Sequence, residues 1–328
     1  MAGNNDMFKG NSILITGGTG SLGRSLVRNL LERGDFQRII VFSRDELKQH
    51  EMKISPGFQD DRIRWFLGDV RDKERLKMAF ADVDYVVHAA ALKQVDTGEY
   101  NPIEFIKTNV LGSQNIVEAS IETGVKKVLA LSTDKASSPI NLYGATKLTA
   151  DKLFVSANIY GVRTSTLFSV VRYGNVIGSR GSVIPIFQKD IKEGRNFRIT
   201  DKRMTRFWIT LEQATNFVLD NLQIMRGGEI FVPKIPSMHI RDLATAMDPE
   251  RPIEIVGIRP GEKLHEEMIS EYESYRTIEW NGRFIILPDL KLEVLYTGSN
   301  RVSDSFSYRS DNNPWKLTIS QMQKFISN

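Results

Sequence analysis

The 328-residue chain contains no cysteine and only four histidines. The absence of cysteine excludes disulfide bridges, thiolate-held metal centres and cysteine nucleophiles. His50, His239 and His265 are scattered along the chain and do not form the spacing of a metal-ligand set. We therefore predict a protein that has no disulfide and holds no metal ion.

Long apolar segments and a strong excess of one charge are missing as well. No run approaches the ~18 apolar residues of a membrane-spanning helix, and residues 1–6 are polar where a signal peptide would need an apolar core. The 44 basic and 40 acidic residues leave a net charge of +4, which is too small to indicate a nucleic-acid partner. We expect a cytoplasmic protein with no membrane and no nucleic acid among its partners.

A glycine-rich turn near the N-terminus is the first motif with a chemical meaning. Residues 13–15 form a short apolar run, glycines follow closely, and residues 25–31 alternate apolar and basic side chains as an amphipathic helix would. Both spacings of the dinucleotide-binding fingerprint are present, in Gly18-x-Gly20-x-x-Gly23 and in Gly17-x-x-Gly20-x-x-Gly23. Glycines allow a tight turn and a close approach of the backbone to a pyrophosphate at the helix N-terminus. The strand before them and the helix after them favour this site over a turn without a ligand.

The end of the second expected strand, residues 38–42, bears on the choice of cofactor. In a Rossmann fold this end binds the adenosine ribose, and an acidic residue there favours NAD. Here Ser43 and Arg44 come first, a hydroxyl and a guanidinium suited to the 2′-phosphate of NADP. Asp45 could instead bind the ribose hydroxyls, and Arg44 could be a solvated surface charge. We predict NADP.

The first half of the chain alternates apolar strands with helical segments. Further strands are expected at residues 64–67, 85–91, 126–132 and 166–171, and a helix at 106–119. This alternation predicts an α/β fold with a Rossmann-type doubly wound parallel sheet. Asp69 follows one strand, where it could accept from the adenine amino group or cap the helix that starts near Asp72. His88 is expected in the core, and Asn109 is expected to bond to backbone.

The pattern changes after residue 178, where elements become shorter, mixed and rich in arginine. Helices are expected at 183–192, 211–225, 240–247 and 263–268, strands at 229–232 and 253–256, and a loop at 297–314. We predict an NADP-binding domain over residues 1–178 and a smaller mixed α/β substrate-binding cap over residues 179–328, with some strands and helices returning to the Rossmann core. Arginines in the cap would suit a phosphate-bearing substrate.

The segment from Ser132 to Lys147 carries the candidate chemistry. Tyr143 and Lys147 are four residues apart on an expected helix and share one face, where the ammonium can lower the pKa of the phenol. A phenol poised in this way can exchange a proton with a sugar hydroxyl. Asp134 and Lys135, at the end of the preceding strand, add an acid and a base. A plain alcohol dehydrogenase has no use for that second pair, so the pattern favours oxidation combined with elimination.

These motifs resemble those of the extended short-chain dehydrogenase/reductases. More closely, they are similar to the soluble inverting UDP-N-acetylglucosamine 4,6-dehydratases of pseudaminic acid biosynthesis. The resemblance covers almost the whole chain and rests on residues 13–23, 42–48, 89–93, 132–147, 172–182, 204–210, 228–237 and 259–265. After Lys93 the chain reads Gln94-Val95-Asp96, where many relatives have His-Val-Pro, in a loop that is expected to face the sugar.

The resemblance implies a set of site residues. The implied catalytic residues are Asp134, Lys135, Tyr143 and Lys147. The implied NADP-binding residues are Gly17, Thr19, Gly20, Ser21, Leu22, Gly23, Ser43, Arg44, Asp45, Glu46, Leu47, Lys48, Asp69, Val70, Ala89, Thr108, Tyr143 and Lys147. The implied substrate contacts are Lys93, Thr133, Asn175, Arg206, Arg259 and Glu262.

The resemblance also implies a reaction on a UDP-sugar. Hydride would leave sugar C4 for NADP while Tyr143 takes the hydroxyl proton. Neutral Lys135 would then remove the C5 proton, protonated Asp134 would donate to the departing C6 hydroxyl, and hydride would return to C6. Reprotonation of C5 from the opposite face would give a UDP-2-acetamido-2,6-dideoxy-4-keto-L-arabino-hexose.

Three other functions remain open from the sequence. They are a nucleotide-sugar 4-epimerase, a dehydratase that retains the C5 configuration, and a non-catalytic NADP-binding sensor. The family also implies a homo-oligomer, built on a dimer and extending to a hexamer.

Overall fold

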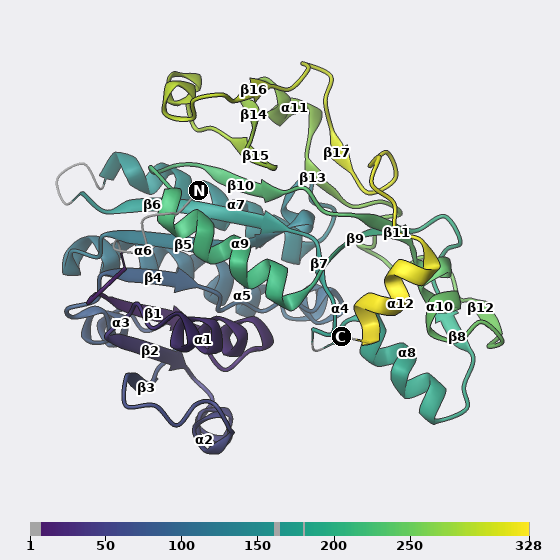
Figure 1. Ribbon diagram of the computed structural model, residues 1–328, viewed down its shortest axis with the longest axis horizontal. Helices are drawn as coiled ribbons and strands as arrows, with labels where there is room; N and C mark the ends of the chain where they lie inside the picture. The colour runs from purple at the N-terminus through teal and green to yellow at the C-terminus, as the bar shows by residue number, and fades with distance from the viewer. Residues whose placement is uncertain (1–7, 161–164, 180, 328) are drawn as a thin grey trace.

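The computed structural model describes residues 8–160, 165–179 and 181–327, and it consists of a large sheet with covering helices and a smaller lobe beside it (Figure 1). Within these residues the large sheet has ten strands. They are β1 (Ser12–Thr16), β2 (Arg38–Ser43), β3 (Ile63–Leu67), β4 (Tyr85–His88), β5 (Lys127–Thr133), β6 (Leu167–Tyr173), β10 (Ile230–Pro233), β14 (Thr277–Trp280), β15 (Arg283–Ile286) and β16 (Asn300–Arg301).

The order of the strands identifies the sheet. It is β16-β14-β15-β10-β6-β5-β4-β1-β2-β3. The strands from β10 to β3 are parallel, and β15, β14 and β16 add an antiparallel edge. The order reverses between β1 and β4, and ligands of a doubly wound sheet bind outside the carboxyl ends of the strands at such a point. The predicted Rossmann-type sheet is confirmed.

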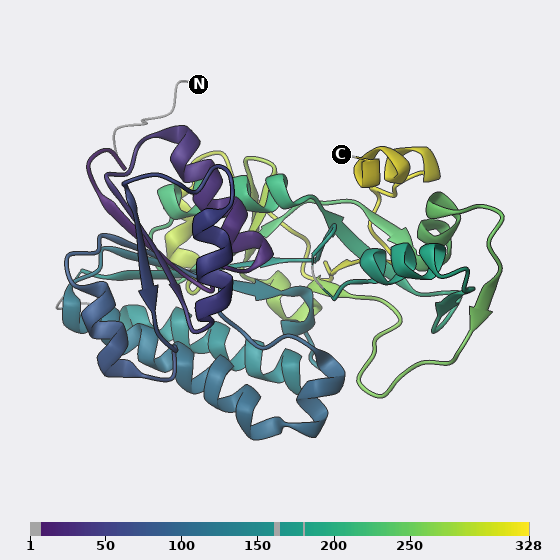
Figure 2. The ribbon, with the colours of Figure 1, turned by 90° about the horizontal axis from the view of Figure 1, so that it is seen from below.

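Helices cover both faces of this sheet, as the view from below shows (Figure 2). Helices α1 (Ser21–Arg33) and α9 (Leu211–Ile224) pack together on one face. Helices α3 (Lys73–Phe80), α6 (Gly112–Thr123) and α7 (Leu142–Tyr160) lie side by side on the other. Because both faces are covered, a strand such as β1 is buried along its whole length, with three apolar residues between Ser12 and Thr16.

Local side-chain chemistry sets several helix ends. Asp45 caps α2 (Glu46–Ile54) through the Lys48 amide, and Asp72 caps α3 in the same way. The suggested capping role of Asp69 is therefore wrong, since Asp72 fills it. Gly34 is the C-cap of helix α1, and its φ of 72° is in the left-handed region that glycine adopts without strain.

A smaller lobe, at the right of Figure 1, has a core of its own. Phe187, Phe197, Trp208 and Met322 are buried in this core. The lobe and its junction with the sheet contain β7 (Asn175–Val176), α8 (Val183–Lys192), β8 (Phe197–Ile199), β9 (Thr205–Ile209), β11 (Ser237–His239), α10 (Ile240–Met247), β12 (Ile253–Ile255) and α12 (Ile319–Ser327). The second half of the chain also supplies β10, β14, β15 and β16 to the large sheet. The domain boundary at residue 178 stays a prediction.

Two expectations about the second half are wrong. The segment expected to be a helix up to Met268 instead ends in strand β13 (Glu267–Ile269), which pairs antiparallel with β17 (Tyr308–Arg309). Residues 297–314 are not entirely loop, because β16 and β17 lie within them. Both errors have one cause, since short strands form through pairing with partners that are distant in sequence and leave little local pattern.

Two element bounds in the first half also differ from expectation. Strand β4 ends at His88, and residues 89–91 continue as a loop. The helix expected at 106–119 begins with a π-helical turn, η2 (Ile106–Leu111), before α6. In the part of the chain that the structure describes, no helix is both long enough and apolar enough to span a membrane.

Candidate active site

A cavity of about 830 Å³ runs from the glycine-rich turn to the smaller lobe. Its walls include the carboxyl ends of β5 and β6 and residues of α8, β8 and β9 from the lobe. The cavity therefore lies where the strand order predicts a ligand site, and the lobe forms part of its wall. Within the described residues, no group of three or more histidine or carboxylate side chains is arranged to hold a metal ion.

The glycine-rich turn fits a dinucleotide because it leaves no space for side chains. Gly17 has a φ of 66°, and a Cβ at this position would lie 2.9 Å from the Ala90 nitrogen. A Cβ at Gly23 would lie 2.6 Å from the Gly17 oxygen. Helix α1 starts at Ser21, and its N-cap Gly20 has no side chain that could cap the first turn. The helix N-terminus thus faces a cavity into which a pyrophosphate fits.

The other predicted cofactor residues surround the same end of the cavity, with two exceptions. Glu46 and Leu47 are not in the cavity wall, and Leu47 is 66% exposed on the first turn of α2. The predicted residues that do line the cavity are Gly17, Thr19, Gly20, Ser21, Leu22, Gly23, Ser43, Arg44, Asp45, Lys48, Asp69, Val70, Ala89, Thr108, Tyr143 and Lys147. Within the described residues, the Thr108 Oγ1 is buried without a hydrogen-bond partner, as expected of a group that bonds to a ligand.

The tip of β2 carries one half-exposed cation and one engaged carboxylate. The Asp45 carboxylate accepts from the Lys48 amide and pairs with the Lys48 ammonium, and these contacts lower its pKa. The Arg44 guanidinium is 54% exposed and lies 3.7 Å from Asp69. Asp69 in turn forms a 2.8 Å ion pair with Arg71. Arg44 is therefore better placed than Asp45 to meet a ligand.

Two residues of the first half have the structural roles expected of them. His88 is buried with its Nδ1 2.8 Å from the Thr16 hydroxyl, and burial lowers its pKa to about 3. Asn109 bonds through its amide to both the N–H and the carbonyl of Leu92 and donates to the Thr146 hydroxyl. It fixes the loop that leads into Lys93.

Tyr143 and Lys147 lie at the base of the cavity on α7, but they do not interact as expected. The Lys147 Nζ donates to the Leu131 carbonyl at 2.7 Å, and burial lowers its pKa. Burial raises the pKa of Tyr143 to about 12, and the cation that partly offsets this rise is Lys135. Lys147 is not among the groups that shift the pKa of the phenol in this structure, and Lys135 is the cation that lowers it.

Lys135 lies between two carboxylates. Its Nζ is 3.1 Å from Asp134 Oδ1 and 3.1 Å from Glu266 Oε1. Burial lowers the pKa of Lys135, but Asp134 and Glu266 outweigh it and raise the pKa above its ordinary value. The expectation of a neutral Lys135 is therefore wrong for this state, in which the amine is charged.

Asp134 is fully buried behind the cavity wall and not part of its lining. Its pKa is raised, chiefly by burial, and the charge of Glu266 adds to the rise. Its Oδ1 accepts from the Thr133 hydroxyl at 2.9 Å, and Thr133 does line the cavity. A proton held by Asp134 can therefore reach a ligand only through a neighbour such as Thr133 or Lys135.

The six predicted substrate contacts all line the cavity. They are Lys93, Thr133, Asn175, Arg206, Arg259 and Glu262. Arg259 is 59% exposed and lies 3.7 Å from Asp96. The loop expected at Gln94-Val95-Asp96 is wrong, because Val95 and Asp96 begin helix α4 (Val95–Tyr100). Arg206 is buried, and both its Nη atoms donate to backbone carbonyls, so it offers fewer free donors than expected.

Two residues that the sequence did not single out complete the site. Glu266 supplies the second carboxylate at Lys135, and no spacing in the sequence connects it to Asp134. Gly144 lies against the Lys135 carbonyl so closely that a Cβ there would clash with it. This contact holds α7, with Tyr143, tightly against the turn η3 (Asp134–Ala136). Its only sequence signal is a glycine inside a helical segment.

With this geometry established, similarity to known proteins identifies the family. The family described as "Polysaccharide biosynthesis protein" matches residues 13–288. The chain belongs to that family. It is an extended short-chain dehydrogenase/reductase, as its motifs indicated.

Among curated relatives, the UDP-N-acetylglucosamine 4,6-dehydratase (inverting) of Campylobacter jejuni subsp. jejuni serotype O:23/36 (strain 81-176) is 55% identical over 318 residues, 94% of this chain and 95% of the relative. The UDP-glucose 4-epimerase of Rickettsia prowazekii (strain Madrid E) is 38% identical over 98% of this chain and 96% of its own length. Both resemblances therefore extend through the cavity and the lobe.

Two solved structures share the fold. Pen from Bacillus thuringiensis is 40% identical, with a TM-score of 0.91 and 98% of both chains covered. The dTDP-glucose 4,6-dehydratase DesIV from Streptomyces venezuelae, solved with NAD and TYD bound, is 25% identical, with a TM-score of 0.69 over 77% of this chain and 86% of that one.

Proposed function

We propose that this protein is a hydro-lyase, an inverting UDP-N-acetylglucosamine 4,6-dehydratase that uses NADP. The observation that carries the proposal is the cluster of Asp134, Lys135 and Glu266 next to Tyr143, at the wall of one cavity. Oxidation at C4 needs a phenol such as Tyr143, whereas elimination of water needs an additional base and acid. The inverting dehydratase of Campylobacter jejuni, 55% identical over almost the whole chain, supports the same activity.

Tyr143 serves the oxidation and its reversal. Bound NADP would supply the hydride chemistry, by accepting hydride from sugar C4 and returning it to C6. After loss of its own proton to solvent, the Tyr143 oxygen would take the proton of the C4 hydroxyl. The charge of Lys135 lowers the pKa of the phenol against the effect of burial, so the same cluster that eliminates water also assists the oxidation. Lys147, held by the Leu131 carbonyl, would fix the floor of the site.

The elimination starts within the Lys135–Asp134 pair. Transfer of one proton from Lys135 Nζ to Asp134 Oδ1, across 3.1 Å, gives a neutral amine and a carboxylic acid. The raised pKa of Asp134 favours this transfer, whereas the raised pKa of Lys135 opposes it. Lys135 then removes the C5 proton, which the 4-ketone has made acidic because the carbanion delocalises into the carbonyl.

The departing hydroxyl receives its proton through Thr133. Asp134 is too deeply buried to touch the sugar, while the Thr133 hydroxyl reaches both Asp134 and the cavity. Thr133 would give its proton to the C6 oxygen and take the one held by Asp134. Water leaves, Lys135 is again an ammonium and Asp134 is again a carboxylate, so the pair is reset. Reprotonation of C5 by solvent water on the opposite face would invert that centre, and Tyr143 would release its proton to solvent.

The product formed from UDP-N-acetylglucosamine without added reductant tests this function. We expect a nucleotide sugar lighter by one water, with a 4-keto group and inverted configuration at C5 in its NMR spectrum. A product of unchanged mass with inverted configuration at C4 would establish a 4-epimerase, which the Rickettsia relative favours. A dehydrated product with the original C5 configuration would establish a retaining dehydratase. No turnover by protein that binds NADP would indicate a sensor.

The preference for NADP depends on Arg44 in this proposal. We expect Arg44→Ala to weaken NADP binding by about tenfold to a hundredfold, because a charge-assisted hydrogen bond contributes about 1.5–3 kcal/mol, and to leave NAD binding unchanged. Calorimetry with both cofactors measures this difference. Arg64→Ala, at an exposed arginine outside the cavity, is the matched control. Equal loss for NADP and NAD would show that Arg44 does not bind the 2′-phosphate.

We also propose a homo-oligomer built on a dimer and extending to a hexamer, and a place at the start of pseudaminic acid biosynthesis. Both rest on the resemblance to the inverting dehydratases.

A further inference from the structure

Glu266 is a buried carboxylate at the heart of the site. It precedes β13, is 2% exposed and lines the cavity. Its Oε1 lies 3.1 Å from Lys135 Nζ and 3.7 Å from Arg206 Nε. Within the described residues, its Oε2 is buried without a hydrogen-bond partner. A charge is rarely kept in such a place unless a neighbouring group needs it, because burial of a carboxylate costs several kcal/mol.

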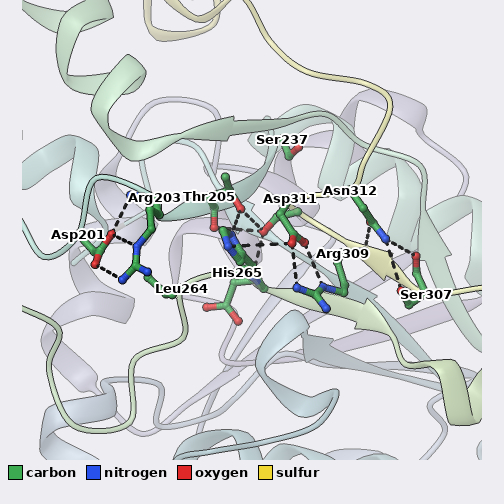
Figure 3. A network of polar contacts seen from close by, with 12 residues as sticks. Asp201, Arg203, Thr205, Ser237, Leu264, His265, Ser307, Arg309, Asp311 and Asn312 are labelled. Atoms are coloured by element: carbon green, nitrogen blue, oxygen red, sulfur yellow. Dashed lines mark hydrogen bonds and ion pairs between the residues drawn. The ribbon is translucent and has the colours of Figure 1, made fainter.

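The backbone around Glu266 is fixed from two sides. The Glu266 N–H donates to the Ser310 hydroxyl at 2.9 Å, and the Ser310 N–H donates to the Glu266 carbonyl at 2.8 Å. One residue earlier, His265 Nδ1 lies 2.8 Å from the Thr205 hydroxyl. Figure 3 shows His265 between Thr205 and Asp311, within a network that joins three separate parts of the chain. These hydrogen bonds attach His265 and the Glu266 backbone to Thr205 and Ser310, and not to the turn η3 that carries Asp134.

Arg206 is fixed as well. Its Nη atoms donate to the carbonyls of Thr205, Lys263 and Leu264, which leaves Nε directed to Glu266. The titratable and charged groups around the Glu266–Lys135 contact are Asp134, Tyr143, Lys93, Arg206 and Lys263. Most of these neighbours are cations. The Glu266 charge therefore offsets a local positive excess around Lys135.

We propose that Glu266 is a positioning residue that holds Lys135 Nζ beside Asp134 and keeps a proton on the Lys135–Asp134 pair. The inference rests on the proposed function, in which this pair carries out the elimination. The negative charge of Glu266 raises the pKa of both Lys135 and Asp134. It favours the charged form of Lys135 and disfavours the charged form of Asp134, so both groups retain their protons to higher pH.

The pH profile of Glu266→Gln tests this role. Glutamine keeps the shape of the side chain and removes its charge. If neutral Lys135 sets the rising limb of kcat/KM and protonated Asp134 the falling limb, both limbs should move to lower pH by about one unit or more. Glu266→Asp, which keeps the charge, should bring both limbs back toward their wild-type positions even if kcat stays low. Glu271→Gln, at an exposed glutamate of the same segment, should leave the profile unchanged.

A lower kcat with unmoved limbs in Glu266→Gln would overturn the proposal, because a purely structural role predicts that result. If Glu266→Gln does not fold, Glu266→Asp carries the test. The shorter side chain withdraws the carboxylate from Lys135, so its limbs should lie at or below the wild-type positions and never above them. Limbs displaced to higher pH would contradict the proposal.

Chemical labelling of Lys135 gives a readout that needs no catalysis. Acetic anhydride reacts only with the neutral amine, and peptide mass spectrometry reports the labelled fraction at each pH. We expect about tenfold faster labelling of Lys135 in Glu266→Gln at neutral pH, since one pKa unit changes the neutral fraction of an ammonium about tenfold. Exposed Lys152 serves as the internal reference.

The two readouts separate the failure of each proposal. If the wild type does not dehydrate UDP-N-acetylglucosamine but labelling of Lys135 accelerates in the variant, the proposed function fails and the action of Glu266 on Lys135 stands. If the wild type dehydrates the sugar but labelling is unchanged, the inference about Glu266 is wrong.

Discussion

Lys135→Ala is expected to abolish exchange of the sugar C5 proton with deuterated solvent and to lower kcat by about 10²- to 10⁴-fold, the usual contribution of a positioned general base. Lys135 is the one amine of the described site that lies between two buried carboxylates and also lines the cavity. Without it, the 4-ketone could still form at Tyr143. We therefore expect reduced cofactor to accumulate on the variant, visible in its nicotinamide absorbance.

The design must separate loss of the base from loss of the fold. Removal of the ammonium leaves Asp134 and Glu266 facing each other without a cation, so NADP binding and circular dichroism should be measured on the same sample. Lys152→Ala, at an exposed lysine of α7, is the matched control. Exchange at the wild-type rate in Lys135→Ala would remove Lys135 from the role of base, whatever happens to turnover.

Arg172→Met should have the largest effect on stability, about 3–5 kcal/mol in the free energy of unfolding, because it leaves two buried carboxylates without their cation. Arg172 is completely buried in β6. Its Nη1 donates to the Met268 carbonyl at 2.8 Å and to Glu273 at 3.1 Å, and its Nη2 lies 3.3 Å from Asp151. One side chain thus connects the central sheet, α7 and the segment after β13.

Urea unfolding followed by tryptophan fluorescence measures this loss. Arg203→Ala is the control, since Arg203 is 68% exposed and pairs with Asp201 at the surface (Figure 3). We expect its urea midpoint to equal that of the wild type, because exposed ion pairs contribute little to stability. Adding Asp151→Asn to Arg172→Met should recover part of the loss, since one of the unpaired charges is removed. An Arg172→Met midpoint equal to that of the control would contradict the assignment.

Much of the site was accessible from the sequence because its motifs are local. The turn from Gly17 to Gly23 and the segment from Ser132 to Lys147 each combine a strand end, a turn and a helix start in consecutive residues, so spacing alone indicates which side chains meet. Helices α8 and α10 were predicted with their observed bounds for the same reason, since an apolar period of 3.6 is a local signal.

The failures involve partners that are distant along the chain. Strand β13 formed where a helix was expected. Glu267–Ile269 pairs with β17, and no local sequence pattern predicts that pairing. Arg206 was expected to face the substrate, but carbonyls on a separate segment occupy its Nη donors. Glu46 and Leu47 match a family motif, yet the capped start of α2 directs them away from the cavity.

The sequence by itself indicated the candidate groups for the proposed chemistry, namely the phenol of Tyr143, the amines of Lys135 and Lys147 and the carboxyl of Asp134. Only the tertiary structure decided which of them hold protons and which can touch a sugar. Glu266 comes within 3.1 Å of Lys135 and keeps it charged, and burial places Asp134 behind Thr133. The physical reason is that the pKa of a group depends on burial and on charges a few ångströms away in space, and residue spacing does not encode either of these across distant segments.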